Sequence, residues 1–242
     1  MRVRVSIAMA VYNGEKHLKE QIDSITCQLL PQDELVISYD NSTDNSLNII
    51  KAYTSKDQRI RYYKNEIRPG VVKNFENAVT YCTGEIIFYS DQDDVWMPDK
   101  IEKVLNKFED PKVTVVIHDS SLTDEELNIT HPSTFKLRNG NTNLFKNLIR
   151  LSYIGCCLAF RSEMKKVVLP IPTIYRSHDW WTGSICSCYG KMEKIDEALI
   201  LHRLHENNAT PVKRPSLRYQ LSVRWIILIN LIIRRFTHQK NK

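Results

Sequence analysis

Glycine is scarce in this 242-residue chain, which has only seven, and no glycine-rich phosphate loop carrying lysine or arginine lies near residues 8–20. That absence argues against nucleotidyl transfer on a phosphate-binding loop. The six cysteines lack the spacing of a zinc knuckle, and a chain of this length does not need disulfides to fold. We therefore expect reduced, mostly buried thiols in a cytosolic protein.

The chain also lacks a long apolar run and, near its C-terminus, any acidic residue. Its most apolar stretch, residues 225–233, is far shorter than the about 20 residues of a membrane span. Residues 216–242 contain no acid, and their six cations account for the whole net charge of +6. Two interpretations stay open: a helix at an anionic membrane surface, or a helix packed on the rest of the protein or in a dimer.

The neutral remainder offers no basic stripe, so we expect no nucleic-acid partner. The first ten residues faintly resemble a signal peptide, but they alternate arginine with valine and end in no cleavage pattern. We predict a first strand there.

Strand-like and helix-like segments alternate through the first half of the chain. The predicted strands cover residues 3–9, 35–39, 59–63, 85–89 and 113–118, and the predicted helices cover 14–28, 45–53, 71–82 and 98–109. This order is typical of an α/β fold with a mostly parallel central sheet and helices on both faces.

The second half is less regular. We predict a loop-rich stretch over 119–143, helices over 144–151 and 177–190, strands over 154–160 and 194–196, and a turn over 206–208. No clean linker precedes residue 212. The chain is therefore predicted to be one domain over 1–212, followed by a basic amphipathic helix over 213–242.

An acidic cluster follows the apolar run Ile86–Tyr89, where Asp91, Asp93 and Asp94 put three carboxylates within four residues. Open α/β sheets bind ligands just outside the carboxyl ends of their strands, and clustered carboxylates repel each other unless a cation lies among them. Oxygen ligands suit Mg²⁺ or Mn²⁺. The alternative is an acidic loop that caps a helix beginning near Pro98.

Four segments together resemble the inverting glycosyltransferases of family 2, which have the GT-A fold. They are the opening strand and turn at 6–15, the Asp-Asn-Ser-Thr-Asp element at 40–44, the extended Asp-x-Asp motif at 91–100, and the His-Asp-Trp-Trp of 178–181 with the segment 201–208. The last pair resembles a rhamnosyltransferase-like subgroup of bacterial surface-polysaccharide enzymes. The resemblance covers about residues 3–210.

The resemblance implies a role for each matching residue. Asp93 would be the main metal ligand, Asp91 would face the ribose or the metal, and Asp179 would be the general base. The donor's nucleotide would be held by the Ala10 main chain and Asp40, with further nucleotide-sugar contacts from Tyr12, Lys73 and Trp180. His205 would approach the metal or the diphosphate. The chain departs from the family pattern at Tyr39, Asn41, His202, Leu204 and Glu206.

Several of these residues have structural alternatives. Asp179 could be stabilised in the first turn of a helix, where backbone N–H groups would lower its pKa. Asp40 could close an Asx turn with Ser42 or cap the next helix. Lys73 could lie on a solvated helix face, and Trp180 could be an ordinary core residue.

These observations predict a metal-dependent inverting glycosyltransferase that uses a dTDP- or UDP-sugar with Mn²⁺ or Mg²⁺. Rhamnose is the suggested sugar, and a surface glycan or lipid-linked oligosaccharide the suggested acceptor. The expected location is the cytoplasm, at the inner face of the cell membrane. A second hypothesis is a catalytically silent nucleotide-sugar-binding subunit that anchors a partner at the membrane.

Overall fold

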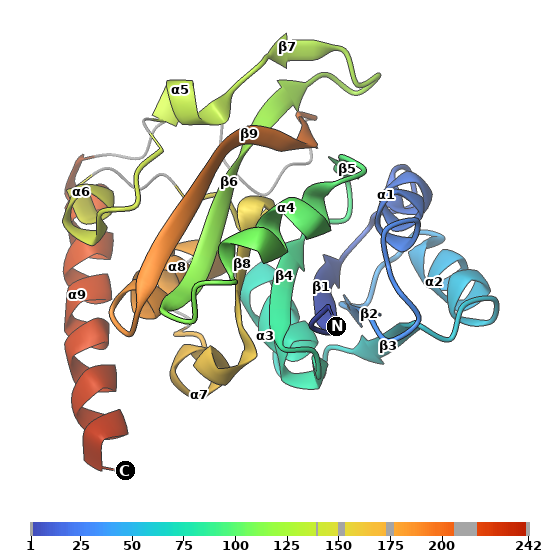
Figure 1. Ribbon diagram of the computed structural model, residues 1–242. Coiled ribbons are helices and arrows are strands. Elements are labelled where there is room, and N and C mark those ends of the chain that lie inside the picture. Colours follow the sequence, from blue (N-terminus) through green and yellow to red (C-terminus); the bar gives the residue numbers. More distant parts are fainter. Residues whose placement is uncertain (1, 139, 150–152, 173–176, 206–216, 241–242) are drawn as a thin grey trace.

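The computed structural model describes residues 2–138, 140–149, 153–172, 177–205 and 217–240. Within these residues one curled sheet runs in the order β3-β2-β1-β4-β8-β6-β9-β5, with β7 paired to β6 (Figure 1). The strands are β1 (Val5–Val11), β2 (Glu34–Tyr39), β3 (Ile60–Lys64), β4 (Ile86–Ser90), β5 (Val95–Trp96), β6 (Val113–Thr123), β7 (Ile129–His131), β8 (Leu158–Arg161) and β9 (Lys191–Arg203).

Helices cover both faces of the sheet, as predicted, and each face has its own apolar cluster. On one face lie α1 (Leu18–Thr26), α2 (Ser46–Thr54) and α4 (Lys100–Lys107). On the other lie α3 (Val71–Tyr81), α7 (Lys165–Val168), α8 (His178–Ser187) and α9 (Leu217–Lys240). The short helices are α5 (Thr134–Arg138) and α6 (Leu144–Ile149), and the 3₁₀ turns are η1 (Gly155–Cys157) and η2 (Ser162–Met164).

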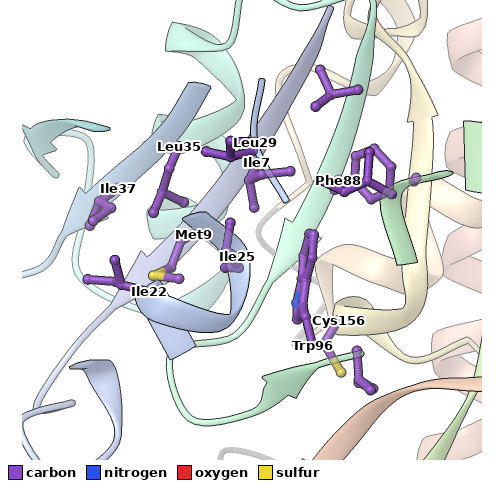
Figure 2. Packing of buried hydrophobic residues seen from close by; sticks show 14 of the residues in the cluster. Ile7, Met9, Ile22, Ile25, Leu29, Leu35, Ile37, Phe88, Trp96 and Cys156 are labelled. Carbon is purple, nitrogen blue, oxygen red and sulfur yellow. The ribbon is translucent and has the colours of Figure 1, made fainter. Parts of the chain in front are cut away.

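The central strands are mostly apolar, as their burial on both faces requires. Every residue of β2 and β4 is buried, and the apolar residues of β1 divide between the two clusters. Ile7 and Met9 of β1 pack beside Ile22 and Ile25 of α1 in the first cluster (Figure 2). Continuous apolar runs are the expected pattern for parallel strands between two helical layers.

One feature of strand order was not predicted. The segment 113–118 follows the four parallel strands in sequence, but β8 lies between β4 and β6 and runs antiparallel to both. β6 and β9 are parallel, so only β5, β7 and β8 run against the main direction within the described chain. The mostly parallel α/β fold is therefore confirmed, with an antiparallel strand at its centre.

Local predictions in the second half were only partly right. The stretch 119–143 is not only loop, because β6 continues to Thr123 and β7 and α5 follow. The strand predicted at 194–196 is confirmed, but it is part of the much longer, 13-residue β9. The strand placed at 154–160 begins as the 3₁₀ turn η1. In β9 the cause is visible: its partly exposed, polar positions interrupt the apolar run by which the central strands are recognised. The turn at 206–208 lies outside the described residues.

Helix α9 packs one side against the body. Ile227 and Leu231 are buried in the second cluster, and the Arg234 guanidinium donates to the Pro170 carbonyl and lies 5.4 Å from the Trp181 ring centroid. Its opposite side exposes apolar side chains, namely those of Trp225, Leu228, Ile229, Ile232 and Ile233. Among the described helices, none combines the length and apolarity that a membrane crossing requires.

Candidate active site

The acidic cluster leaves the carboxyl end of β4 and is held in place by the end of β9. Val95 and Trp96 pair antiparallel with Leu201 and Ile200. The carboxylate of Asp94 turns inward, where it is fully buried and accepts from the His202 ring and the Arg203 N–H at 3.0 and 3.1 Å.

The three acids do not cap the following helix. Helix α4 begins only at Lys100, and its N-cap residue, Asp99, makes no capping hydrogen bond through its side chain. The capping interpretation of Asp91, Asp93 and Asp94 is therefore wrong.

Asp93 is fixed by two residues at the end of β9. The Arg203 Nε donates to the Asp93 carbonyl at 3.0 Å, and the same guanidinium also bonds Glu125 and Glu20. His205 Nε2 lies 2.9 Å from Asp93 Oδ2, and this hydrogen bond raises the pKa of His205. The structure thus brings together two of the predicted metal ligands, Asp93 and His205.

The middle residue of the acidic motif joins it to the end of β1. The Gln92 amide accepts from the Tyr12 N–H at 2.8 Å and donates to the Tyr12 carbonyl at 2.9 Å. Gly14 is needed beside it, because a Cβ at that position would lie 2.6 Å from the Gln92 side chain. The Tyr12 side chain itself is 56% exposed and faces solvent.

The turn after β1 is also joined to the loop after β2. The Asn13 N–H donates to Ser42 Oγ and its side chain accepts from the Thr43 N–H, at 2.9 and 2.8 Å. Asn13 and Asn41 both have positive φ values, 49° and 34°, a conformation that asparagine tolerates. Ala10 is partly buried at the end of β1, opposite Ser38 of β2.

Asp40 makes neither of the two structural contacts considered for it. Its Oδ2 accepts from the Gly70 N–H at 2.7 Å, while Asp44 rather than Asp40 receives the Ser46 N–H at the start of α2. In the described part of the chain the Asp40 Oδ1 has no hydrogen-bond partner. One oxygen of a buried carboxylate at the end of β2 thus stays available for a donor N–H.

Asp179 lies in the first turn of α8, with both the Ser177 hydroxyl and the Trp180 N–H donating to its Oδ1. These bonds favour the charged carboxylate, but burial outweighs them and raises the pKa of Asp179 to about 6. The helix N–H groups lower this pKa as expected, but the net shift is upward because the residue is only 7% exposed. A carboxylate with a pKa near 6 is well suited to accept a proton at neutral pH.

Trp180 and Lys73, the two remaining predicted site residues, contact the body of the protein. Trp180 is partly buried at the edge of the second cluster, whereas Trp181 is fully buried and donates to the Val168 carbonyl at 2.8 Å. The Lys73 ammonium contacts Glu76 at 2.6 Å and the Ile171 carbonyl at 3.0 Å, so it is part of an internal ion pair on α3. Neither alternative proposed for Lys73, a donor contact or a solvated face, describes these bonds.

The electrostatics of the site fit a divalent cation. Burial and the charges of Asp94 and Asp93 raise the pKa of Asp91, and Asp179 adds to this effect. Because the charge of Asp179 affects the pKa of Asp91, Asp179 lies within electrostatic range of the acidic motif. Two carboxylates and an imidazole form a donor set that Mn²⁺ accepts, and a cation would relieve the repulsion among the acids. Their ligand atoms are not gathered in advance: within the described residues, the set found within 4.8 Å is Asp94, Cys156 and His202.

Two residues of the site were missed from the sequence. Gln92 lies between two predicted ligands, but its amide bonds depend on the nearness of β1 and β4. The contact of Arg203 with the Asp93 carbonyl depends on the pairing of β9 with β5. Neither contact has a local sequence signal, because the partners are 80 and 110 positions apart.

Comparison with known proteins identifies the family of the chain. The sequence model described as glycosyl transferase family 2 matches residues 6–168. The dTDP-rhamnosyl transferase RfbG of Shigella flexneri is 27% identical over 83% of this chain and 72% of its own length. An uncharacterized glycosyltransferase of Nostoc sp. is 26% identical over 85% of this chain, which spans 66% of that relative's length.

Solved structures with the same fold include S. aureus TarS in complex with UDP-GlcNAc, with a TM-score of 0.72 and 17% identity over 94% of this chain and 66% of that chain. The mannosyltransferase PcManGT of Pyrobaculum calidifontis, in complex with GDP-Man and Mn²⁺, has a TM-score of 0.63 and 19% identity, and the match covers 86% of this chain and 59% of that chain. These similarities confirm the predicted GT-A fold. Because the family model covers most of the chain, this protein belongs to glycosyl transferase family 2.

Proposed function

We propose that this protein is a metal-dependent inverting glycosyltransferase that takes a sugar from a dTDP- or UDP-sugar, with rhamnose as the first sugar to test. The observation that carries the proposal is the placement of Asp179, a buried carboxylate with a pKa near 6, within electrostatic range of Asp91. Asp179 suits removal of a proton, and Asp91 suits binding of a cation that would contact the leaving diphosphate. RfbG, by its name a dTDP-rhamnosyl transferase, supports the choice of donor.

The residues of this chain divide the reaction between them. Asp91, Asp93 and His205 would hold Mn²⁺ or Mg²⁺, which neutralises the charge that develops on the departing diphosphate. Asp179 would accept the proton of the attacking acceptor hydroxyl. Attack from the side opposite the diphosphate inverts the anomeric carbon. The Oδ1 of Asp40 would accept the ring N–H of the pyrimidine, and Gln92 would keep the turn at Tyr12 in register with the acidic motif.

The test is thermal unfolding with UDP, dTDP and GDP, each with and without Mn²⁺. A ligand that binds only the native state raises the melting temperature by mass action. We expect a metal-dependent rise with one pyrimidine diphosphate, its loss in Asp93→Ala, and its retention in Asp99→Ala, an exposed acid in the same loop. No rise with any nucleotide would overturn the donor-site assignments.

Sugar transfer itself requires a second assay. With the nucleotide identified, release of that nucleoside diphosphate from its sugar conjugates, and the product's anomeric configuration, report the reaction. Nucleotide binding without turnover would instead support the hypothesis of a silent binding subunit. The observation that favours this hypothesis is Tyr39, which stands at a position where the family pattern has an acid and whose hydroxyl donates to the Ser42 carbonyl.

We further propose that α9 contacts an anionic membrane surface, which would bring the enzyme to a lipid-linked acceptor at the inner face of the cell membrane. The exposed side of the helix carries Trp225, Ile229 and Ile233, while Ile227 anchors the other side. Apolar side chains next to arginines suit the boundary of an anionic bilayer. Sedimentation with phosphatidylglycerol vesicles, but not with phosphatidylcholine vesicles, is expected, and Ile229→Asp should reduce it. Membrane retention of a protein lacking residues 213–242 would contradict the idea.

A further inference from the structure

A second cluster of potential ligands lies behind the acidic motif, on its buried side. We propose that Asp94, Cys156 and His202 form a site for a thiophilic divalent ion such as Zn²⁺, separate from the oxygen-rich site of the proposed function. Their ligand atoms lie within 4.8 Å of one another, and the three residues come from the acidic loop, η1 and β9.

The distances within this cluster match those of a tetrahedral ion. With Zn–N near 2.0 Å and Zn–S near 2.3 Å, a tetrahedral angle separates nitrogen from sulfur by about 3.5 Å, and nitrogen from oxygen by about 3.3 Å. The observed separations from His202 Nδ1 are 3.6 Å to Cys156 Sγ and 3.0 Å to Asp94 Oδ1. The nitrogen–sulfur separation therefore fits a shared ion, whereas the Nδ1–Oδ1 separation is that of a hydrogen bond, which an ion bound through Oδ2 would replace.

An unpartnered polar atom independently indicates a ligand. Asp94 is fully buried, and its Oδ2 has no hydrogen-bond partner within the described chain, although Oδ1 accepts two bonds. A buried carboxylate oxygen without a partner loses its hydration and gains nothing in return. A cation bound to Oδ2 would supply the missing interaction and leave the Arg203 N–H on Oδ1.

The charge in the cluster stays balanced when the ion binds. One Zn²⁺ would replace the thiol proton of Cys156 and the Nδ1 proton of a charged His202 imidazolium paired with Asp94, so two protons leave as two charges enter. This matters because an uncompensated charge is costly in a buried site. The neighbouring Lys100 ammonium is directed elsewhere: it donates to the Cys156 carbonyl at 2.8 Å and lies 3.7 Å from the Trp96 ring centroid.

The ligand types separate this site from the predicted donor site. A thiolate and an imidazole select Zn²⁺ or Co²⁺, whereas carboxylates with phosphate oxygens suit Mg²⁺ or Mn²⁺. Cys156 lies in the first apolar cluster with Trp96 (Figure 2). The side chain of His202 is 18% exposed, which would give an ion a path from solvent. The ion would join β9, η1 and the acidic loop at one point.

Titration of the full chain with Co²⁺ under reducing conditions tests the proposal. We expect a thiolate-to-cobalt charge-transfer band that saturates at about one equivalent and is displaced by Zn²⁺. Cys156→Ser and His202→Gln should each lose the band. Cys27→Ser is the matched control, because Cys27 is an exposed thiol at the end of α1 and should leave the band unchanged.

Asp93→Ala keeps this result separate from that of the proposed function. It should keep the cobalt band while it loses the nucleotide-dependent thermal shift, so either proposal can fail alone. Thermal unfolding without metal checks that each variant is folded, and the two variants remove different ligands. A wild-type protein without the band, a band that persists in folded Cys156→Ser, or a band lost in Cys27→Ser would each overturn the proposal.

Discussion

The contacts of Asp179 predict how transfer depends on pH. Burial raises the pKa of this carboxyl group to about 6, and the Ser177 hydroxyl opposes the rise by donating to its charged form. A general base acts only when it is ionised. Below pH 6, kcat/KM should therefore fall about tenfold for each pH unit.

Replacing Ser177 with alanine should move this limb toward neutral pH. A hydrogen bond to a charged group contributes about 1.5–3 kcal/mol, and because the Trp180 N–H remains on Asp179, we take about 1.4 kcal/mol, or about one pKa unit. A rise from about 6 to about 7 cuts the ionised fraction at pH 6 from about a half to about a tenth. At pH 9 the rates of the two proteins should agree.

The measurement is kcat/KM for donor turnover between about pH 5 and pH 9 in wild type, Ser177→Ala and Ser187→Ala. Ser187 is a suitable control because its hydroxyl bonds the Gly183 carbonyl on the same helix and does not contact Asp179. The control should follow the wild-type profile. An acidic limb that stays in place in folded Ser177→Ala, or moves to lower pH, would refute Asp179 as the base.

Three further predictions follow. Asp179→Asn should lower kcat by about 10²–10⁴ and keep the nucleotide-induced thermal shift. The native state keeps the Asp179 proton up to about pH 6 and the unfolded chain only up to about pH 4. In urea unfolding, the free energy of unfolding of the wild type should therefore fall as the pH rises from about 4 to about 6, and that of the variant should not. Gln92→Ala removes both bonds to the Tyr12 backbone, about 1–3 kcal/mol together, and should weaken nucleotide binding about tenfold or more by calorimetry. Ile227→Ala should destabilise the protein by about 2–4 kcal/mol in denaturant unfolding, whereas the outward-facing Ile229→Ala should change it by less than about 0.5 kcal/mol; equal effects would show that α9 does not pack as described.

Elements whose signal is local could be predicted from the residues alone. Apolar runs such as Ile86–Tyr89 fill strands buried on both faces, so their pattern shows directly in the sequence. The acidic motif could likewise be placed at the end of a strand, and the structure brings Asp93 and His205 into contact, with Asp179 within electrostatic range of Asp91. Their chemical roles remain predictions that the assays above address.

The contacts that join distant segments could not be predicted in this way and are known from the folded chain. The insertion of β8 between β4 and β6, the bonds of Gln92 to Tyr12 and the pairing of β9 with β5 all depend on which strands become neighbours. The pKa of Asp179 is decided in the same way, since sequence shows a helix start that lowers it, while burial by the folded chain raises it more. Local patterns carry periodicity and propensity, whereas desolvation and strand order are properties of the packed molecule.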